Sequence, residues 1–588
     1  MWLTILLAFS ALCILNFLQK IYRNILVARR TSLPYFILPL SPGMFPTLLY
    51  NTTWYPYVIN TWLPGWLSDN LNDLTSNGRW GTRDWQVKRF GKVYCVVTPR
   101  AIMCNVADAG LANQIVSTRG SFPKPVWQYA IMELYGPNVV TCEDTEWAHH
   151  RRHVTNIFNE KNNDLVWKES IRLVNEMIES WKETSTISGS RDLLVKSVKE
   201  DIYKFALNVF SGAGFGVQMP FHAVAKDSAE VKGPYGVFQD TKTPPEGFDF
   251  TFRSVTAYMN AKIASVVFAN IFLPKWVPRA LLPFLKRDFA AHRDLGAYLK
   301  RIISIKETQD SATASNLIQG MVRDRNRSDT SSSKESSLSD LEIISNTHVF
   351  TIAGHETTAT TLRYALILLA LHQEMQEWAY QGIKEATKDD PVEAMNWDYS
   401  TVYPKLVTPL CVMLETMRLY PPVVTIPKWT GDLARTIHYQ GKDILLDKGV
   451  NLNLNLNGLH YSEEYWGDDA AEFKPQRWDA KNRESFLAKN DDLQGLNAPG
   501  LEYSTVHKPI RGAYMPFSDG FRACLGKKFA QVKVVVALAI LLRQYRIELP
   551  HGENGSHIHA QKALDESFSV LALVMKEDLP LIFRERSQ

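Results

Sequence analysis

The chain has 588 residues, 45% of them hydrophobic and 21% charged, so it is long enough to enclose a large core. With 65 basic and 61 acidic residues, its formal net charge of +4 excludes the strongly basic character typical of proteins that bind nucleic acid. The six cysteines are scattered and show no CxxC spacing. This pattern argues against a disulfide scaffold and a zinc site, and it favours reduced thiols in a cytosolic compartment.

The N-terminal 19 residues, MWLTILLAFSALCILNFLQ, carry no charged side chain. As a helix they would extend about 29 Å, close to the hydrocarbon thickness of a bilayer. Lysine and arginine follow this run and none precedes it, which places the body of the chain in the cytosol. A cleaved signal peptide is the alternative, but such a peptide usually has a basic start and a shorter apolar stretch.

We therefore divide the chain into three parts. A transmembrane anchor is predicted over residues 1–19, a basic and proline-rich linker over residues 20–60, and one large domain over residues 61–588. The prolines of the linker prevent the anchor helix from continuing through it.

Helical spacing of apolar residues dominates the large domain. A capping box at Ser339 and Glu342 opens a long apolar helix that reaches about His372. Short strand-like stretches occur at residues 92–98, 443–446 and 569–574. The stretch GAGFGVQ, residues 212–218, resembles a dinucleotide loop but follows a helical pattern, so we interpret it as a helix end and turn. These patterns predict a mainly α fold with small β-sheets.

One cysteine, Cys524, lies in the stretch FSDGFRACLGKKFA, directly before an apolar helical pattern. A thiolate that binds iron needs a helix N-terminus to keep it ionised and glycines that let the backbone approach a flat macrocycle. Gly520 and Gly526 flank the cysteine. Arg522 offers a cation for haem propionates, and Phe517 can shield the sulfur from water. The structural alternative is a buried cysteine at a helix start.

The spacing Phe517-x-x-Gly520-x-Arg522-x-Cys524-x-Gly526 resembles the haem-binding signature of the cytochrome P-450 family. The resemblance covers nearly the whole chain, and other motifs occur in the family's order. It implies a cytochrome P-450 fold in a single large domain, with haem b as cofactor and Cys524 as the axial ligand of the iron.

The stretch AGHETT, residues 353–358, lies midway along the long predicted helix. Ala353 and Gly354 leave room for a flat cofactor. Glu356 and Thr357 add a carboxylate and a hydroxyl to an otherwise apolar helix. The alternative is a polar patch that faces solvent or bonds back to the i−4 carbonyl. The stretch resembles the family's acid–alcohol pair, which implies that Glu356 and Thr357 are catalytic and deliver protons for oxygen activation.

The stretch LETMRLYPP places Glu415 and Arg418 on one helix face. A surface ion pair of little value is the alternative. Similarity to the family's ExxR motif implies instead a buried pair completed by Arg477, although Gln476 stands where the family commonly has glutamate.

The pair Trp147 and Arg151 is similar to the family's WxxxR helix, which implies contact with a haem propionate. An exposed pair on an amphipathic helix is the alternative. Lys428 stands where many relatives carry a propionate-binding arginine, and it can neutralise charge without the bidentate fork. The adjacent residues His149 and His150 diverge on a helix, so we interpret them as surface histidines.

The function that the resemblance implies is a haem-thiolate monooxygenase, which inserts one oxygen atom from O2 into an apolar small molecule such as a secondary metabolite. Two alternatives remain open: a haem-thiolate isomerase or dehydratase that needs no reductase, and a non-catalytic membrane haem protein. The Glu356–Thr357 pair argues against the first, because such family members often lack it. Product formation after release of the sixth ligand would exclude the second.

No part of the sequence binds nicotinamide or flavin convincingly, so the electrons must come from a partner. The family's microsomal members use an NADPH-cytochrome P-450 reductase, and the endoplasmic reticulum membrane, with the catalytic domain facing the cytosol, is the implied location. Five basic residues around the cysteine loop form either a docking face for this acidic partner or a solvated surface: Lys508, Arg511, Lys527, Lys528 and Lys533.

The sequence does not choose among lipid-like, terpenoid and polyketide substrates. The family pattern and the apolar content assign substrate contacts to residues 122–138, 210–258, 423–426 and 568–570.

Overall fold

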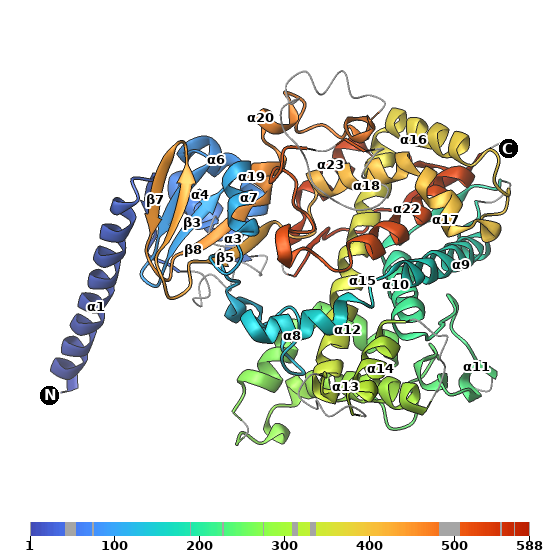
Figure 1. The fold of residues 1–588 in the computed structure, drawn as a ribbon, viewed down its shortest axis with the longest axis horizontal. Helices are drawn as coiled ribbons and strands as arrows, with labels where there is room; N and C mark the ends of the chain where they lie inside the picture. The colour runs from blue at the N-terminus through green and yellow to red at the C-terminus, as the bar shows by residue number, and fades with distance from the viewer. Residues whose placement is uncertain are drawn as a thin grey trace. The chain divides into compact units, whose positions relative to one another are not determined.

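The computed structural model describes residues 2–41, 54–72, 76–187, 190–225, 229–274, 276–308, 316–329, 337–480, 506–507, 509–552, 556–569 and 571–586. The chain forms two compact units. Unit 1 comprises Met1–Pro125, Leu414–Cys524 and Gln561–Glu577. Unit 2 comprises Val126–Met413, Leu525–Ala560 and Asp578–Gln588. Helices predominate and the sheets are small, which confirms the predicted fold class (Figure 1).

The N-terminal apolar run forms one continuous helix, α1 (Trp2–Arg30) (Figure 1). Its side chains are exposed along most of its length. Its stretch Thr4–Arg30 is long and apolar enough to cross a bilayer. A second stretch, Phe252–Phe272, passes the same test of length and composition but is partly buried. Helix α1 continues beyond Gln19 because no proline or glycine interrupts the chain before Pro34.

The main sheet of unit 1 has the strand order β1-β2-β3-β8-β5. Its strands are β1 (Tyr35–Ile37), β2 (Val93–Val97), β3 (Ile102–Val106), β8 (Asn451–Asn455) and β5 (Thr425–Trp429). Strands β2 and β3 pair antiparallel and are buried along their whole length, and β8 pairs parallel with β3 and antiparallel with β5. The strand expected at residues 92–98 is therefore confirmed as β2.

Two hairpins complete the strands of unit 1. Strands β6 (Arg435–Tyr439) and β7 (Lys442–Leu446) join through Gln440 and Gly441, whose φ angles of 50° and 71° suit a two-residue hairpin turn. Strand β7 confirms the strand expected at residues 443–446. The stretch at 569–574 instead forms two short antiparallel strands, β10 (Phe568–Ser569) and β11 (Leu573–Val574).

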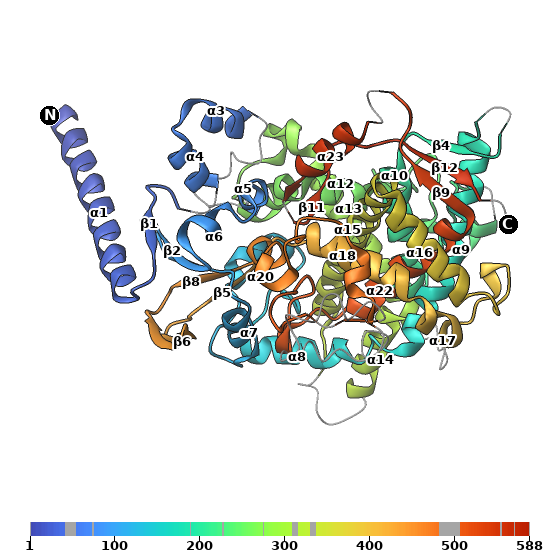
Figure 2. The same cartoon turned by 90° about the horizontal axis from the view of Figure 1, so that it is seen from above.

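Unit 2 is built around α15 (Asp340–Leu371), which packs against α10 (Val198–Phe210), α13 (Lys286–Thr308) and α22 (Lys527–Gln544) (Figures 1 and 2). The predicted capping box is present, because Ser339 accepts from the Glu342 N–H while the Glu342 carboxylate accepts from the Ser339 N–H. Helix α10 runs into a π-helical turn, Ser211–Phe215, that ends at Gly216 with φ of 68°. The GAGFGVQ stretch is therefore a helix end, as predicted.

The remaining elements are one small sheet and the other helices. A small sheet of unit 2 has the order β4 (Leu193–Val195), β12 (Leu581–Glu585) and β9 (Tyr545–Glu548). The other α-helices among the described residues are α3 (Trp54–Trp62), α4 (Gly65–Asn72), α5 (Ser76–Thr82), α6 (Trp85–Phe90), α7 (Ala109–Ser117), α8 (Asp144–Thr155), α9 (Glu160–Ser185), α11 (Ala229–Lys232), α12 (Phe252–Val267), α14 (Leu317–Asp329), α16 (Gln373–Ala386), α17 (Tyr399–Val402), α18 (Val407–Leu419), α19 (Leu456–His460), α20 (Glu463–Trp466) and α23 (His557–Asp565).

Candidate functional site

The cysteine loop of unit 1 is a tight, backbone-bonded turn. The Cys524 N–H donates to the Phe517 carbonyl at 2.9 Å, and the Gly520 N–H donates to the Asp519 carboxylate at 2.7 Å. Gly520 has a φ of 67°, and a Cβ there would lie 2.3 Å from the Val116 carbonyl oxygen, so only glycine fits. The loop therefore holds its cysteine in a defined backbone conformation.

The Cys524 thiol is exposed at the end of this loop, while Phe517 and Arg522 are half-buried. Helix α22 begins at Lys527 with Gly526 as its N-cap residue. Cys524 lies three residues before the first residue of this helix in the sequence, a position that thiolate ligands commonly occupy. An exposed thiol does not match the alternative of a buried cysteine at a helix start.

In unit 2, the AGHETT turn interrupts the burial of α15. The helix is buried from Ile343 to Ile352 and again from Thr358 to Leu371. Between these stretches Ala353 is exposed, and Gly354, Glu356 and Thr357 are half-buried. His355 is buried within the same turn, so one face of this uncovered turn of α15 is accessible while the other is packed.

The polar side chains of this turn have different environments. The Thr357 hydroxyl donates to the Ala353 carbonyl at 2.7 Å, which is the i−4 bond considered as the alternative. Its oxygen keeps lone pairs for accepting a further hydrogen bond. Burial raises the pKa of Glu356 to about 7, so this carboxyl group can both hold and release a proton near neutral pH.

Helix α8 of unit 2 carries the predicted propionate-binding pair. Trp147 is buried and Arg151 is half-buried, with the guanidinium carbon 6.0 Å from the Trp147 ring centroid. On β5 of unit 1, Lys428 is buried. Their role as propionate-binding residues stays a prediction.

The interpretation of His150 as a surface histidine is wrong. Its side chain is buried, its Nδ1 accepts from the Asn346 side chain at 2.9 Å, and burial lowers its pKa to about 4. His149 is partly exposed, with Nε2 3.7 Å from the Glu342 carboxylate. The buried face of α8 contains Trp147, His150 and Val154, so three- and four-residue spacing identifies His150 as inward-facing.

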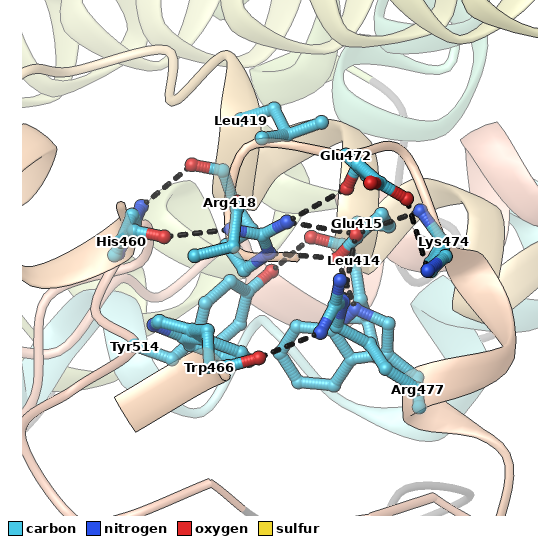
Figure 3. Close-up of polar contacts among 12 residues, drawn as sticks. Leu414, Glu415, Arg418, Leu419, His460, Trp466, Glu472, Lys474, Arg477 and Tyr514 are labelled. Atoms are coloured by element: carbon cyan, nitrogen blue, oxygen red, sulfur yellow. Dashed lines mark hydrogen bonds and ion pairs between the residues drawn. The ribbon is translucent and has the colours of Figure 1, made fainter. Parts of the chain in front are cut away.

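The Glu415 network of unit 1 confirms the predicted buried pair and its third member (Figure 3). Arg418 donates to Glu415 from Nε at 2.8 Å and from Nη2 at 2.9 Å. Arg477 donates to the same carboxylate from Nε at 2.9 Å. Although burial opposes ionisation, the two guanidinium groups hold the pKa of Glu415 below its usual value. The alternative of a surface ion pair is therefore excluded.

The same network contains two contacts to Glu415 that sequence reasoning missed. The indole N–H of Trp478 donates to Glu415 at 2.9 Å, and the Lys474 backbone N–H donates at 3.0 Å. Arg418 also donates to the His460 carbonyl at 2.7 Å and to the Glu472 carbonyl (Figure 3). Gln476 has a local backbone contact instead, because its carbonyl accepts from the Asp479 N–H at 3.1 Å. No sequence pattern distinguished Trp478 from the other tryptophans.

The basic residues around the cysteine loop are not one surface cluster. Lys533 is 1% exposed, so including it in either a docking face or a solvated face was wrong. It lies in a stretch of α22 that is buried on every side, from Phe529 to Leu542. Arg511 is exposed, and Lys527 and Lys528 are half-buried. Lys508 lies outside the described residues.

The segments predicted to contact substrate are partly accessible. The Trp127 side chain is 51% exposed and Val423 is 39% exposed, whereas Phe122 and Phe210 are buried. Val570 lies outside the described residues.

The described residues fit the haem that the resemblance implies. In unit 1 they provide the exposed cysteine Cys524, a donor type suited to iron. In unit 2 they provide small residues where α15 is uncovered, together with a tryptophan and an arginine on α8.

Comparison with known proteins supports the same conclusion. The profile of the family described as Cytochrome P-450 matches residues 63–568. A cytochrome P-450 monooxygenase of Arthrobotrys oligospora is 28% identical, over 83% of this chain and 83% of its own. One from Penicillium rubens is 28% identical, over 92% of this chain and 90% of its own. The cytochrome P-450 monooxygenase of the phomenoic acid biosynthesis cluster of Leptosphaeria maculans is 25% identical, over 96% and 94%.

Solved structures share the fold. A cytochrome P-450 crystal structure superposes with a TM-score of 0.61 at 18% identity, covering 86% of this chain and 97% of that one. The haem domain of a mutant cytochrome P-450 also gives 0.61 at 18% identity, covering 94% and 98%. The chain therefore belongs to the cytochrome P-450 family, and it is an oxidoreductase of the monooxygenase class.

Proposed function

We propose that this enzyme is a haem-thiolate monooxygenase in which Cys524 is the axial ligand of haem b. The observation that carries the proposal is the acid–alcohol pair, Glu356 and Thr357, on the uncovered turn of α15. When bound, the haem supplies the redox chemistry that activates dioxygen and oxidises an apolar substrate. A family member without this activation step has no need of a carboxyl group with a pKa near 7 beside a hydroxyl.

The chain's own residues have three tasks in this proposal. Arg522, Trp147, Arg151 and Lys428 bind the propionates, with the cations neutralising their charge. Ala353 and Gly354 leave space for the macrocycle, and Phe517 shields the sulfur from water. Glu356 holds a proton and Thr357 passes it on, because oxygen activation consumes protons in a site that otherwise excludes water.

We propose an NADPH-cytochrome P-450 reductase as the electron donor. Arg511, Lys527 and Lys528 lie near Cys524 in the sequence and offer positive charge to an acidic partner. Helix α1 would anchor the enzyme in the endoplasmic reticulum membrane as a single-pass protein with its catalytic domain, residues 61–588, in the cytosol. The anchor over residues 1–19 and the linker over residues 20–60 remain the proposed division of the N-terminal part.

The proposed substrate is an apolar small molecule of secondary metabolism. A relative from the phomenoic acid biosynthesis cluster, which matches 96% of this chain, supports this class. The aromatic content of the chain suits such a ligand.

Expression with the reductase, followed by metabolite profiling against a Cys524→Ala control, tests the proposal. We expect a product that contains one added oxygen atom, requires NADPH and is absent from the control. A rearranged or dehydrated product formed without NADPH would identify an isomerase or dehydratase instead. Haem uptake without any turnover would contradict the monooxygenase assignment.

A further inference from the structure

Lys533 is a buried lysine in the middle of α22, outside the residues assigned above to catalysis. Its ammonium group donates to the Gly354 carbonyl at 2.9 Å and to the Thr358 hydroxyl at 2.9 Å, with a longer bond of 3.4 Å to the Ala206 carbonyl. Among the described residues, no carboxylate forms an ion pair with it. The lysine therefore depends on neutral oxygen atoms of α15 and α10.

An unpaired buried ammonium is unfavourable in a packed core. Burial lowers the pKa of Lys533 to about 7, which shows how strongly the site opposes the charge. The titratable group that faces it from α15 is His355, which is also buried; His355 Nε2–H donates to the Tyr203 carbonyl at 3.0 Å and its Nδ1 accepts from Asn260 at 2.9 Å. An apolar side chain of similar length would fill this position without the cost, so the hydrogen bonds are what the lysine adds.

Two of these bonds bracket the proposed catalytic pair. Gly354 and Thr358 are one helical turn apart, and Glu356 and Thr357 lie between them. The Thr358 hydroxyl also donates to the Gly354 carbonyl at 2.8 Å, and such back-bonding tends to bend a helix. Lys533 thus joins both ends of the turn and connects them to α22.

Helix α10 restricts the same turn. A Cβ at Gly354 would lie 3.0 Å from the Phe210 ring, so the two helices approach closely there. Phe210 contacts Phe529 of α22 with ring centroids 5.8 Å apart. The turn that carries Glu356 and Thr357 is therefore held from both α10 and α22.

We propose that Lys533 is a positioning residue for the Glu356–Thr357 pair, acting through its hydrogen bonds to Gly354 and Thr358. This inference rests on the proposed role of that pair in proton delivery. Lys533 touches neither substrate nor cofactor in this proposal. It fixes the backbone from which the acid and the alcohol project.

The test uses the full-length, haem-loaded protein with reductase and NADPH, in the absence of an added substrate. Each O2 released as hydrogen peroxide consumes two electrons and two protons, whereas each O2 reduced to two waters consumes four of each. NADPH, oxygen and peroxide measured together therefore give the ratio of water to peroxide, which reports proton delivery. The variants are Lys533→Met, Thr358→Val and Thr357→Ala, and the matched control is Lys182→Met, an exposed lysine on α9.

We expect the first three variants to lower the ratio of water to peroxide about tenfold, the usual effect of losing a supporting contact, and the control to leave it unchanged. Amide hydrogen exchange should accelerate in the peptide that covers residues 354–358 in Lys533→Met and Thr358→Val. The melting temperature of Lys533→Met should equal or exceed that of the unmodified protein, because an apolar side chain replaces a buried charge.

The outcomes separate this inference from the function on which it rests. If Thr357→Ala lowers the ratio but Lys533→Met and Thr358→Val do not, positioning by Lys533 is refuted and proton delivery stands. If Thr357→Ala leaves the ratio unchanged, both are refuted. If Lys533→Met does not fold, Thr358→Val still removes one of the same contacts and decides the question.

Discussion

Single residues with altered acidity carry much of the chemistry proposed for this enzyme. Glu356 is the clearest case, because burial raises its pKa from 4.5 to about 7. Its native form therefore binds a proton that the unfolded chain releases over this range. The group contributes stability that is fully present below pH 4.5 and is lost as the pH rises through about 7.

Replacement of Glu356 by glutamine should remove this dependence on pH. The melting temperature of the variant should exceed that of the unmodified protein by more at pH 8 than at pH 5. At pH 8 the unmodified protein must either ionise its buried Glu356 or keep it protonated, and the variant has no such group. Each unit of pKa shift corresponds to about 1.4 kcal/mol of stability. Glutamine cannot donate its proton in turnover, so the ratio of water to peroxide should be low at every pH. Thermal melts and oxygen balances across this range check both expectations. A difference in melting temperature that does not change with pH would contradict the assigned acidity.

His150 on α8 should change the stability with pH in the opposite direction to Glu356. Its pKa is lowered to about 4 by burial, so the stability it contributes is present above its ordinary value of 6.5 and is lost as the pH falls through about 4. His150→Gln should make the protein less sensitive to acid than the unmodified chain. A matched change at the partly exposed His149 should have a smaller effect on the acid midpoint, followed by circular dichroism. Equal effects at both positions would argue that the burial of His150 is unimportant.

At the scale of an element, the C-terminal half of α18 depends on the Glu415 network. Breaking a buried ion pair typically costs about 3–5 kcal/mol, so loss of Arg418 or Arg477 endangers the fold itself. The indole N–H of Trp478 offers a milder test, because it donates to the charged Glu415. Trp466 is a matched control, since its indole N–H donates to the neutral carbonyl of Leu459 at 3.0 Å.

We expect Trp478→Phe to lower the urea midpoint more than Trp466→Phe. A hydrogen bond to a charged group contributes about 1.5–3 kcal/mol, against about 0.5–1.5 kcal/mol for a neutral one, while the loss of ring volume is the same in both variants. Urea titrations of the two variants, followed by tryptophan fluorescence and haem absorbance, measure the difference. Equal midpoints would show that the Trp478 contact adds nothing to the network.

Features whose residues lie close together in the sequence were predicted, whereas most contacts between distant segments were not. Helix α15 and its capping box were predicted because one continuous stretch of sequence contains both the capping residues and a long run of apolar residues. The Glu415–Arg418 pair was predicted in the same way, because its residues are three positions apart. Arg477 was assigned to the pair by the resemblance to the cytochrome P-450 family.

The contacts of Trp478 and Lys533 depend on residues far away in the sequence. A single lysine within the largely apolar run FAQVKVVVALAILL was nevertheless an available signal of a buried charge. The burial of His150 was not predicted, because the interpretation rested on its adjacency to His149. Its three- and four-residue spacing from Trp147 and Val154 indicates the buried face.

At the scale of the whole molecule, the proposed anchor should be separable from the enzyme. Deletion of residues 2–30 removes helix α1, whose apolar side chains are exposed. The truncated chain should move from the membrane fraction to the soluble fraction and should retain its haem absorbance, because the sequence motifs for haem binding all lie beyond this helix. Fractionation with carbonate washing gives the answer. A truncated chain that stays membrane-bound would show that other segments attach the enzyme.

The central claim is that Cys524 binds the haem iron as a thiolate, and the absorption of the reduced carbon monoxide adduct tests it most directly. We predict that the purified protein gives the red-shifted band of a thiolate-ligated haem and that Cys524→Ser loses this band. A histidine-type band in the unmodified protein, or a thiolate-type band that persists in Cys524→Ser, would contradict the account.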